Sequence, residues 1–321
     1  MFTPRPRFGD QTPPAIFPPL LGAFGLGLAW RRAGEVFAAP TAVSELILGA
    51  VTLLFLFCLV AYGIKVRRRP GVVIEDLRVL PGRAGLAALV LSLYLLAATL
   101  VPLARPLAEA VLWAGLALHL GLVALVIRGF LTGPAEQRAV TPVWHLLFVG
   151  FIVAPIAALP LGHVGLSTVI FYGAGAAAAV IWTLSLVQLI RRDVPVPLRP
   201  LLAIHLAPAC LLGTVAMLLD RPGAALVLAG LAGAILAALL VRLAWVIRAG
   251  FTPLWGAFTF PLAAFASLML TLAAAGQGGA FRLVGAVALI GASLAIPAIA
   301  AKVMQAWAKG GLGPKTNAAR V

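Results

Sequence analysis

The sequence predicts an all-α membrane protein in which ten transmembrane helices form five consecutive helical hairpins. Three observations lead to this fold class. Of the 321 residues, 63% are hydrophobic and 10% are charged, whereas soluble domains are about 45–50% apolar and about 25% charged. The apolar residues form runs close to the ~20 residues that cross a bilayer. The basic residues lie mainly in every second connection between these runs.

Clusters of Arg, Pro or Gly separate the apolar runs and so define the expected spans. These are 14–30, 43–64, 84–103, 108–127, 142–161, 165–190, 200–219, 223–247, 254–275 and 282–306. The chain then divides into an N-terminal segment at 1–13, a transmembrane domain at 14–306 and a tail at 307–321. Arg5 and Arg7 precede the first run, but that run is too long for a signal-peptide core, so we expect a retained helix.

The distribution of basic residues predicts the orientation of the chain. With the N-terminus in the cytoplasm, only five of the 24 Lys and Arg residues fall on the external side, and the other 19 are cytoplasmic. The external ones are Arg31, Arg32, Arg105, Arg221 and Arg282. This asymmetry follows the positive-inside rule. It predicts that both termini are cytoplasmic, which requires an even number of spans.

Prolines recur inside the first helices of successive hairpins. Pro155, Pro208 and Pro261 follow one another at intervals of 53 residues, and Pro19 has a comparable place in the first hairpin. A proline within a span bends the helix and frees a carbonyl group, which lipid tolerates only against protein or a water-filled cavity. We therefore expect these kinked helices to surround a central aqueous path. The alternative is simple packing, because proline is common in membrane helices.

The charged residues exclude several function classes. A net charge of +15 is typical of nucleic-acid-binding proteins, but here the bases lie in short loops where topology requires them, so no nucleic-acid partner is expected. The nine acidic residues lie in loops or at helix ends, and no paired carboxylates, HExxH or GxSxG motif is present. We therefore expect no enzyme activity, no metal and no cofactor. Cys58 and Cys210 lie within apolar runs and are interpreted as small buried hydrophobic residues.

Two of the four histidines lie well inside expected spans. His119 and His205 are interpreted as neutral residues hydrogen-bonded between helices, with a position in a cavity lining as the alternative. His145, near a helix start, and His163, in a turn, are expected at the membrane interface. Neither His119 nor His205 has a second ligand three or four residues away, which argues against a metal site.

The span at 254–275 contains the best candidate for a gate. Phe258, Phe260 and Phe265 surround Thr259 and Pro261. Aromatic side chains in membrane helices usually serve packing, but Phe260 directly precedes the expected kink, where its ring could close a narrow path by its bulk. The candidate pore-lining residues are Phe24, Phe258, Thr259 and His205.

Four stretches resemble the tellurite-resistance/dicarboxylate transporter family, which includes the plant guard-cell slow-type anion channels. They are the Pro- and Gly-rich first helix ending in LAW at 28–30, LAPA at 206–209, the segment 243–248, and WGAFTFP at 255–261, which is the most specific. The resemblance extends over nearly the whole chain in length, helix number and topology.

The resemblance implies that the five hairpins surround a pseudo-fivefold central pore, with odd helices lining it and even helices outside. It also implies homotrimers and a phenylalanine that plugs the pore, which corresponds to Phe260. Two departures are visible. The span at 84–103 lacks a kink-forming proline, and the terminal segments are too short for the regulatory tails of the plant channels.

The function expected from these features is an anion channel or channel-like transporter in the inner (plasma) membrane. It would conduct small inorganic or organic anions through a path gated by Phe260. The alternative is a carrier or exporter of tellurite or C4-dicarboxylates, because kinked helices and a phenylalanine would serve either mechanism. A membrane enzyme or scaffold would need a polar cluster or a binding tail, and the sequence has neither.

Overall fold

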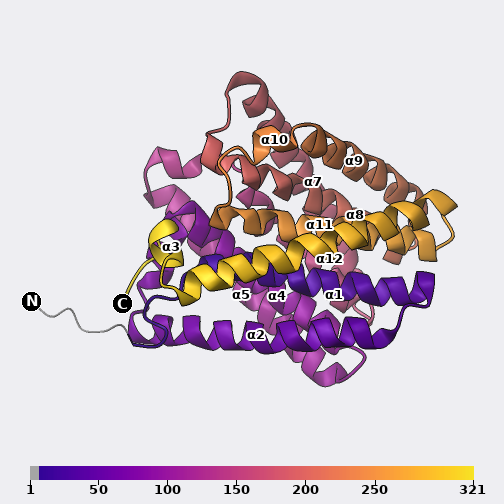
Figure 1. The fold of residues 1–321 in the computed structure, drawn as a ribbon, viewed down its shortest axis with the longest axis horizontal. Helices are drawn as coiled ribbons and strands as arrows, with labels where there is room; N and C mark the ends of the chain where they lie inside the picture. The colour runs from indigo at the N-terminus through magenta and orange to yellow at the C-terminus, as the bar shows by residue number, and fades with distance from the viewer. Residues whose placement is uncertain (1–6) are drawn as a thin grey trace, which may run out of the picture.

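A computed structural model describes residues 7–321, and these form helices and turns without any strand (Figure 1). Arg5, counted above, lies outside the described residues. Eight helices in this part of the chain are long and apolar enough to cross a membrane. They are α2 (Thr41–Arg68), α4 (Leu80–Leu100), α5 (Arg105–Thr132), α7 (Val164–Arg191), η5 with α8 (Val196–Leu218), α9 (Pro222–Val241), η6 with α11 (Pro253–Ala274) and α12 (Gly279–Ala308). The expected all-α membrane fold is therefore confirmed.

The other two expected spans are helical but less regular. The span at 14–30 corresponds to η1 (Pro14–Ile16) and α1 (Phe17–Phe37), and α1 continues past Arg31 and Arg32. The span at 142–161 is divided into three short helices. These are the π-helix η3 (His145–Val149), the 3₁₀-helix η4 (Gly150–Val153) and α6 (Pro155–Ala158).

The helices form two layers that differ in burial. Other helices bury 89% of the most apolar stretch of α4 and 83% of that in η5 with α8, but only 17% of that in α9. A third or less of the corresponding stretch is buried in four further helices, α2, α5, α7 and α12. The inner layer consists of η1 with α1, α4, the three short helices from η3 to α6, η5 with α8, and η6 with α11. In each hairpin the first segment is therefore inner and the second is outer.

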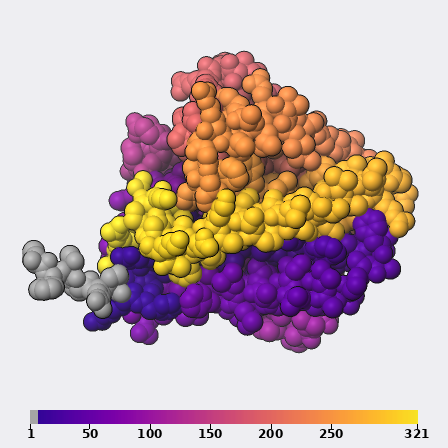
Figure 2. All heavy atoms as spheres, viewed as in Figure 1, coloured from indigo at the N-terminus to yellow at the C-terminus, as the bar shows by residue number. Residues whose placement is uncertain are grey.

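Contacts between elements close the inner layer into a ring. Starting at α1, each inner segment contacts the next one along the chain, and α11 returns to contact α1. Each outer helix packs on the inner segment of its own hairpin, and α12 contacts both α11 and α1. On the face shown in Figure 2, α12 forms a continuous band across the surface. The exposed side chains of the outer layer are mainly Leu, Val, Ile and Phe, as lipid contact requires.

Four of the five inner segments begin with turns that are not α-helical. Turns of 3₁₀-helix precede α1, α6, α8 and α11, and a π-helix also precedes α6. Pro155 begins α6, Pro208 lies in the first turn of α8, and Pro261 lies inside α11. Only α4 begins without such turns, and beyond Pro81 in its first turn it contains no proline. The missing backbone bonds and fixed φ angle of proline account for this difference.

The remaining short helices are α3 (Val72–Arg78), η2 (Ala135–Arg138), α10 (Leu243–Val246) and α13 (Leu312–Lys315). The connection containing α3 holds a buried ion pair, although the sequence analysis expected only loop or helix-end acids. Lys65 Nζ lies 2.9 Å from Asp76 Oδ2, and both side chains are fully buried. The Tyr62 hydroxyl and the backbone N–H of Ala319 also donate hydrogen bonds to Asp76, and Lys65 donates to the carbonyl oxygen of Thr12. This cluster joins both ends of the described chain to the connection between α2 and α3.

Candidate functional site: two cavities within the inner layer

Two cavities lie between the inner segments, one near each end of the ring. The N-end cavity, of about 40 Å³, lies where the inner segments begin. Its lining comes from all five segments, and mostly from their first turns. These residues are Ala15, Pro18, Leu21, Pro81, Ala84, Ala88, Leu146, Leu201, Ile204, Ala207, Pro253, Leu254, Gly256, Ala257, Phe260 and Pro261. The inner segments therefore direct their N-terminal ends toward one narrow apolar space.

The C-end cavity lies at the opposite ends of the same segments and is wider, at about 210 Å³. It too receives residues from all five inner segments, including three charged side chains of α1. The lining is Gly25, Leu28, Arg31, Arg32, Glu35, Leu95, Ala98, Val101, Pro102, Ile156, Pro160, Leu211, Thr214, Leu218, Phe260, Ala263, Ala264 and Ser267.

Phe260 lies between the two cavities. It belongs to both linings, and no other described residue does. Its side chain is only 5% exposed. A Cβ atom placed on Gly25 of α1 would lie 3.2 Å from Cδ2 of the Phe260 ring and 3.0 Å from Cβ of Ala263. The ring therefore packs closely on the glycine face of α1.

Close approach of α1 and α11 fixes the position of this ring. A Cβ on Gly22 would lie 2.3 Å from Cβ of Thr259, and a Cβ on Gly256 would lie 3.1 Å from Cβ of Pro18. The Thr259 hydroxyl lies 3.0 Å from the carbonyl oxygen of Pro18 and 2.7 Å from that of Gly256. Small residues at this contact let the two backbones approach each other. Thr259 anchors the start of α11 to α1, and this places Phe260 toward the space between the segments.

The two cavities have different electrostatic character. The N-end cavity has an apolar lining, but it faces the N-terminal turns of helices, where the backbone carries partial positive charge. In the C-end cavity, Arg31 lies 2.8 Å from Glu45 and also donates to the carbonyl oxygen of Thr99. Arg32 lies 2.9 Å from Glu35. Each of the two arginines that line this cavity is therefore paired with a carboxylate, so these four groups carry no net charge.

The other aromatic and proline candidates have different surroundings. Phe24 is fully buried against Phe55, with ring centroids 5.6 Å apart, and Phe258 packs on Trp255 at 5.7 Å. Together with Thr259, they are absent from both cavity linings. Among the four kink prolines Pro19, Pro155, Pro208 and Pro261, only Pro261 belongs to a lining. The other three shape the inner segments from positions behind the cavities.

The histidines form two buried interhelical contacts. His145 Nε2 lies 3.0 Å from His205 Nδ1, which joins η3 to η5 outside both cavities. His145 is 2% exposed, so its side chain is enclosed by protein. The ring of His119 contacts the Tyr94 hydroxyl at 3.0 Å and the Leu147 carbonyl oxygen at 2.9 Å. Within residues 7–321, no three His, Cys, Asp or Glu side chains gather as metal ligands would.

Sequence reasoning missed three contributors to this site. Gly25 supports the Phe260 ring, Pro18 lines the N-end cavity, and Arg31 lies at the C-end cavity. The spacing of Gly22 and Gly25 on one face of the first helix is a signal that could have identified the first of these. Arg31 was counted only as a loop charge, because α1 was expected to end before it.

A family model described as voltage-dependent anion channel (SLAC1) matches residues 11–304. This match confirms the resemblance that was drawn from the sequence. No curated protein matches the chain.

Proposed function

Because the chain belongs to the voltage-dependent anion channel family, we propose that it conducts small anions across a bilayer through a path that Phe260 closes. Its membership makes it a multi-pass membrane protein of a channel and transporter family. One observation carries the proposal: Phe260 alone among the described residues lines both cavities of the inner layer. Moving its ring would join the N-end and C-end cavities into one passage.

Electrostatics supports an anion as the permeating species. The inner segments direct N-terminal turns at the N-end cavity, and the positive end of a helix dipole attracts anions. At the C-end cavity, Arg31 and Arg32 are each paired with a carboxylate, so this end adds no net positive charge. In neither cavity does a charged side chain lie next to Phe260, so no charged group there would hold an anion tightly. Attraction at the N-end cavity, with weak binding beside Phe260, suits conduction.

The proposed arrangement in the membrane has ten spans, with the two less regular segments counted as crossings. Five inner segments then surround a pseudo-fivefold pore, and the even number of spans leaves both termini in the cytoplasm. The excess of basic residues at the end of the molecule that holds the connection between α2 and α3 supports this orientation. A homotrimer in the inner (plasma) membrane remains the expectation from the family resemblance.

The decisive experiment compares Phe260→Ala with Phe258→Ala and the unaltered chain in liposomes. We expect Phe260→Ala to raise chloride or nitrate flux about tenfold, which corresponds to ~1.4 kcal/mol of barrier. Phe258→Ala is the matched control, because it also removes a phenyl ring, and Phe258, two residues away, lines neither cavity. Equal flux in all three folded proteins would exclude Phe260 as the gate. An absence of anion flux even in Phe260→Ala would contradict the proposed function.

The second candidate is a carrier for tellurite or a C4-dicarboxylate. The volume of the C-end cavity, about 210 Å³, favours this reading, and its two arginines could hold a small dianion in exchange for their present partners Glu45 and Glu35. A carrier would show saturable uptake and exchange of labelled malate against internal malate. A channel would pass current in proportion to the driving force and would show no such exchange.

A further inference from the structure

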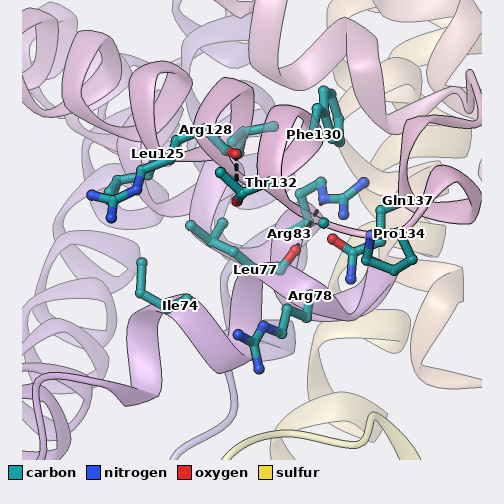
Figure 3. A pocket seen from close by; sticks show the side chains of 13 residues that line it. Ile74, Leu77, Arg78, Arg83, Leu125, Arg128, Phe130, Thr132, Pro134 and Gln137 are labelled. Atoms are coloured by element: carbon teal, nitrogen blue, oxygen red, sulfur yellow. Dashed lines mark hydrogen bonds between the residues drawn. The ribbon is translucent and has the colours of Figure 1, made fainter.

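A separate pocket of about 580 Å³ lies outside the inner ring, between α3, the first turn of α4 and the last turns of α5 (Figure 3). Its lining combines apolar side chains with three arginines. The residues are Ile74, Leu77, Arg78, Arg83, Leu125, Val126, Arg128, Gly129, Phe130, Thr132, Gly133, Pro134 and Gln137. It contains no residue of either central cavity, so the proposed conduction path does not use it.

Arg83 is the most unusual residue of this pocket. Its side chain is only 5% exposed, and its Nε donates to the carbonyl oxygen of Leu77 at 3.1 Å. The guanidinium also lies over the ring of Phe130, 5.1 Å from the centroid. Within residues 7–321, its two terminal nitrogens have no hydrogen-bond acceptor, and Arg83 has no ion-pair partner. These nitrogens are not enclosed by protein, and Arg83 lines the pocket, so an anion that entered it could pair with them.

The other charged groups of the lining have the same sign. Arg78 and Arg128 are both exposed, and neither lies on the same side of the pocket as Arg83 (Figure 3). Among the described residues, neither of them has an ion-pair partner, and the lining contains no carboxylate. Both exposed side chains are long enough to turn toward a bound anion, whereas packing on Phe130 holds Arg83 in place. Three guanidinium groups around one pocket suit a phosphate group.

The position of the pocket along α5 indicates which phosphate compound it holds. Helix α5 has 28 residues and is about 42 Å long, which exceeds the ~30 Å thickness of the hydrocarbon core. Its last turns, where Arg128 lies, therefore reach the headgroup region. Beside the arginines, Leu125 and Ile74 are 36% and 42% exposed, so one side of the pocket continues into an apolar surface.

We propose that this pocket binds the headgroup of one anionic phospholipid. The phosphate would lie against Arg83, with Arg78 and Arg128 closing over it, and the start of an acyl chain would lie along Leu125. Basic pockets between membrane helices at the headgroup level bind anionic lipids in this way. The mixed lining favours the lipid over free phosphate, because an ion alone would leave the apolar half uncovered.

Native mass spectrometry of the delipidated full chain, titrated with phosphatidylglycerol or phosphatidylcholine, tests the proposal. We expect one tightly bound phosphatidylglycerol and at least about tenfold weaker binding in Arg83→Gln, which is the loss of one charge-assisted contact. Arg78→Gln combined with Arg128→Gln changes only exposed side chains, so it tests the site without disturbing the core. Arg67→Gln is the matched control, because Arg67 is exposed and does not line the pocket.

Three outcomes would overturn the proposal. The first is equal affinity for phosphatidylglycerol and phosphatidylcholine. The second is that the pocket variants do not differ from their references: both bind phosphatidylglycerol as the unaltered chain does, or the Arg67→Gln control loses as much binding as they do. The third is binding of inorganic phosphate as tight as that of the lipid, which would assign the site to a free anion. Because the readout is binding, each result is independent of whether the chain conducts anions.

Discussion

The inner and outer layers differ in the regularity of their helices. Outer helices α2, α5, α7, α9 and α12 are continuous over 20 to 30 residues, even though α12 contains Pro297. Inner segments begin in 3₁₀ or π turns in four cases out of five. Outer helices face lipid, where an unpaired backbone group has no partner. The difference indicates that irregular backbone is confined to places that protein or a cavity covers.

The layers also differ in how tightly they pack. Glycines of the inner segments touch neighbouring backbone, whereas many glycines of the outer helices face open space. The environment of a residue, rather than its type, should therefore decide the effect of a substitution. Three matched pairs of variants test this, with the free energy of unfolding in mixed detergent micelles as the common measurement.

The largest effect is expected from the glycine pair. A Cβ on Gly85 of α4 would lie 2.2 Å from the carbonyl oxygen of Pro14, so Gly85→Leu must displace backbone. We expect a loss of about 3 kcal/mol or more, or no folded protein. Gly121→Leu on α5 meets nothing within 4 Å and should leave stability unchanged. Equal losses in the two variants would contradict the two-layer interpretation.

An intermediate effect is expected from a leucine pair. Leu91 on α4 is 1% exposed, and Leu294 on α12 is 73% exposed. Leu91→Ala leaves a cavity that neighbouring helices do not fill, which costs about 2 kcal/mol. In Leu294→Ala, lipid fills the vacated space, because its chains are as apolar as leucine. A loss of stability in Leu294→Ala that is larger than in Leu91→Ala would show that protein covers this face, as in an oligomer.

The smallest effect is expected from a threonine pair. The hydroxyl of Thr259 bonds to two carbonyl groups, one of them on α1, whereas Thr183 on α7 bonds only to the Ala179 carbonyl on its own exposed face. Substitution by Val keeps the shape and removes the hydroxyl. Thr259→Val should cost about 1 kcal/mol, and Thr183→Val should be nearly neutral. If Thr259→Val proves neutral, its hydroxyl does not anchor α11 to α1.

Local sequence signals were sufficient to locate the ten apolar segments, but not the short helices α3, η2, α10 and α13. Long apolar runs and the clusters of Arg, Pro and Gly between them predicted where the segments lie. The central prolines predicted less, because α11 continues through Pro261. The rotation of each helix was harder to predict. Only its place before Pro261 distinguished Phe260 from Phe24 and Phe258 in the sequence, whereas close packing at Gly22 and Gly25 decides which ring lies between the cavities. Such packing depends on residues more than 200 positions apart.

Charged residues showed the same limit. Asp76 lies in a connection expected to be solvated, but residues near both ends of the described chain cover it. Arg83 was counted only as a topological charge, although its side chain is buried over Phe130. Burial of this kind depends on which distant segments fold over a connection, and neither local composition nor helical periodicity reports that.

The bond from Ala319 to Asp76 has a consequence for the order of assembly during synthesis. The carboxylate emerges from the ribosome 243 residues before the backbone amide of Ala319, which donates the last hydrogen bond of the cluster. Until Ala319 is in place, Lys65 and Tyr62 are the hydrogen-bond donors to the Asp76 carboxylate. Closure of the cluster would therefore mark a molecule in which every segment from α4 to α12 has already been translated.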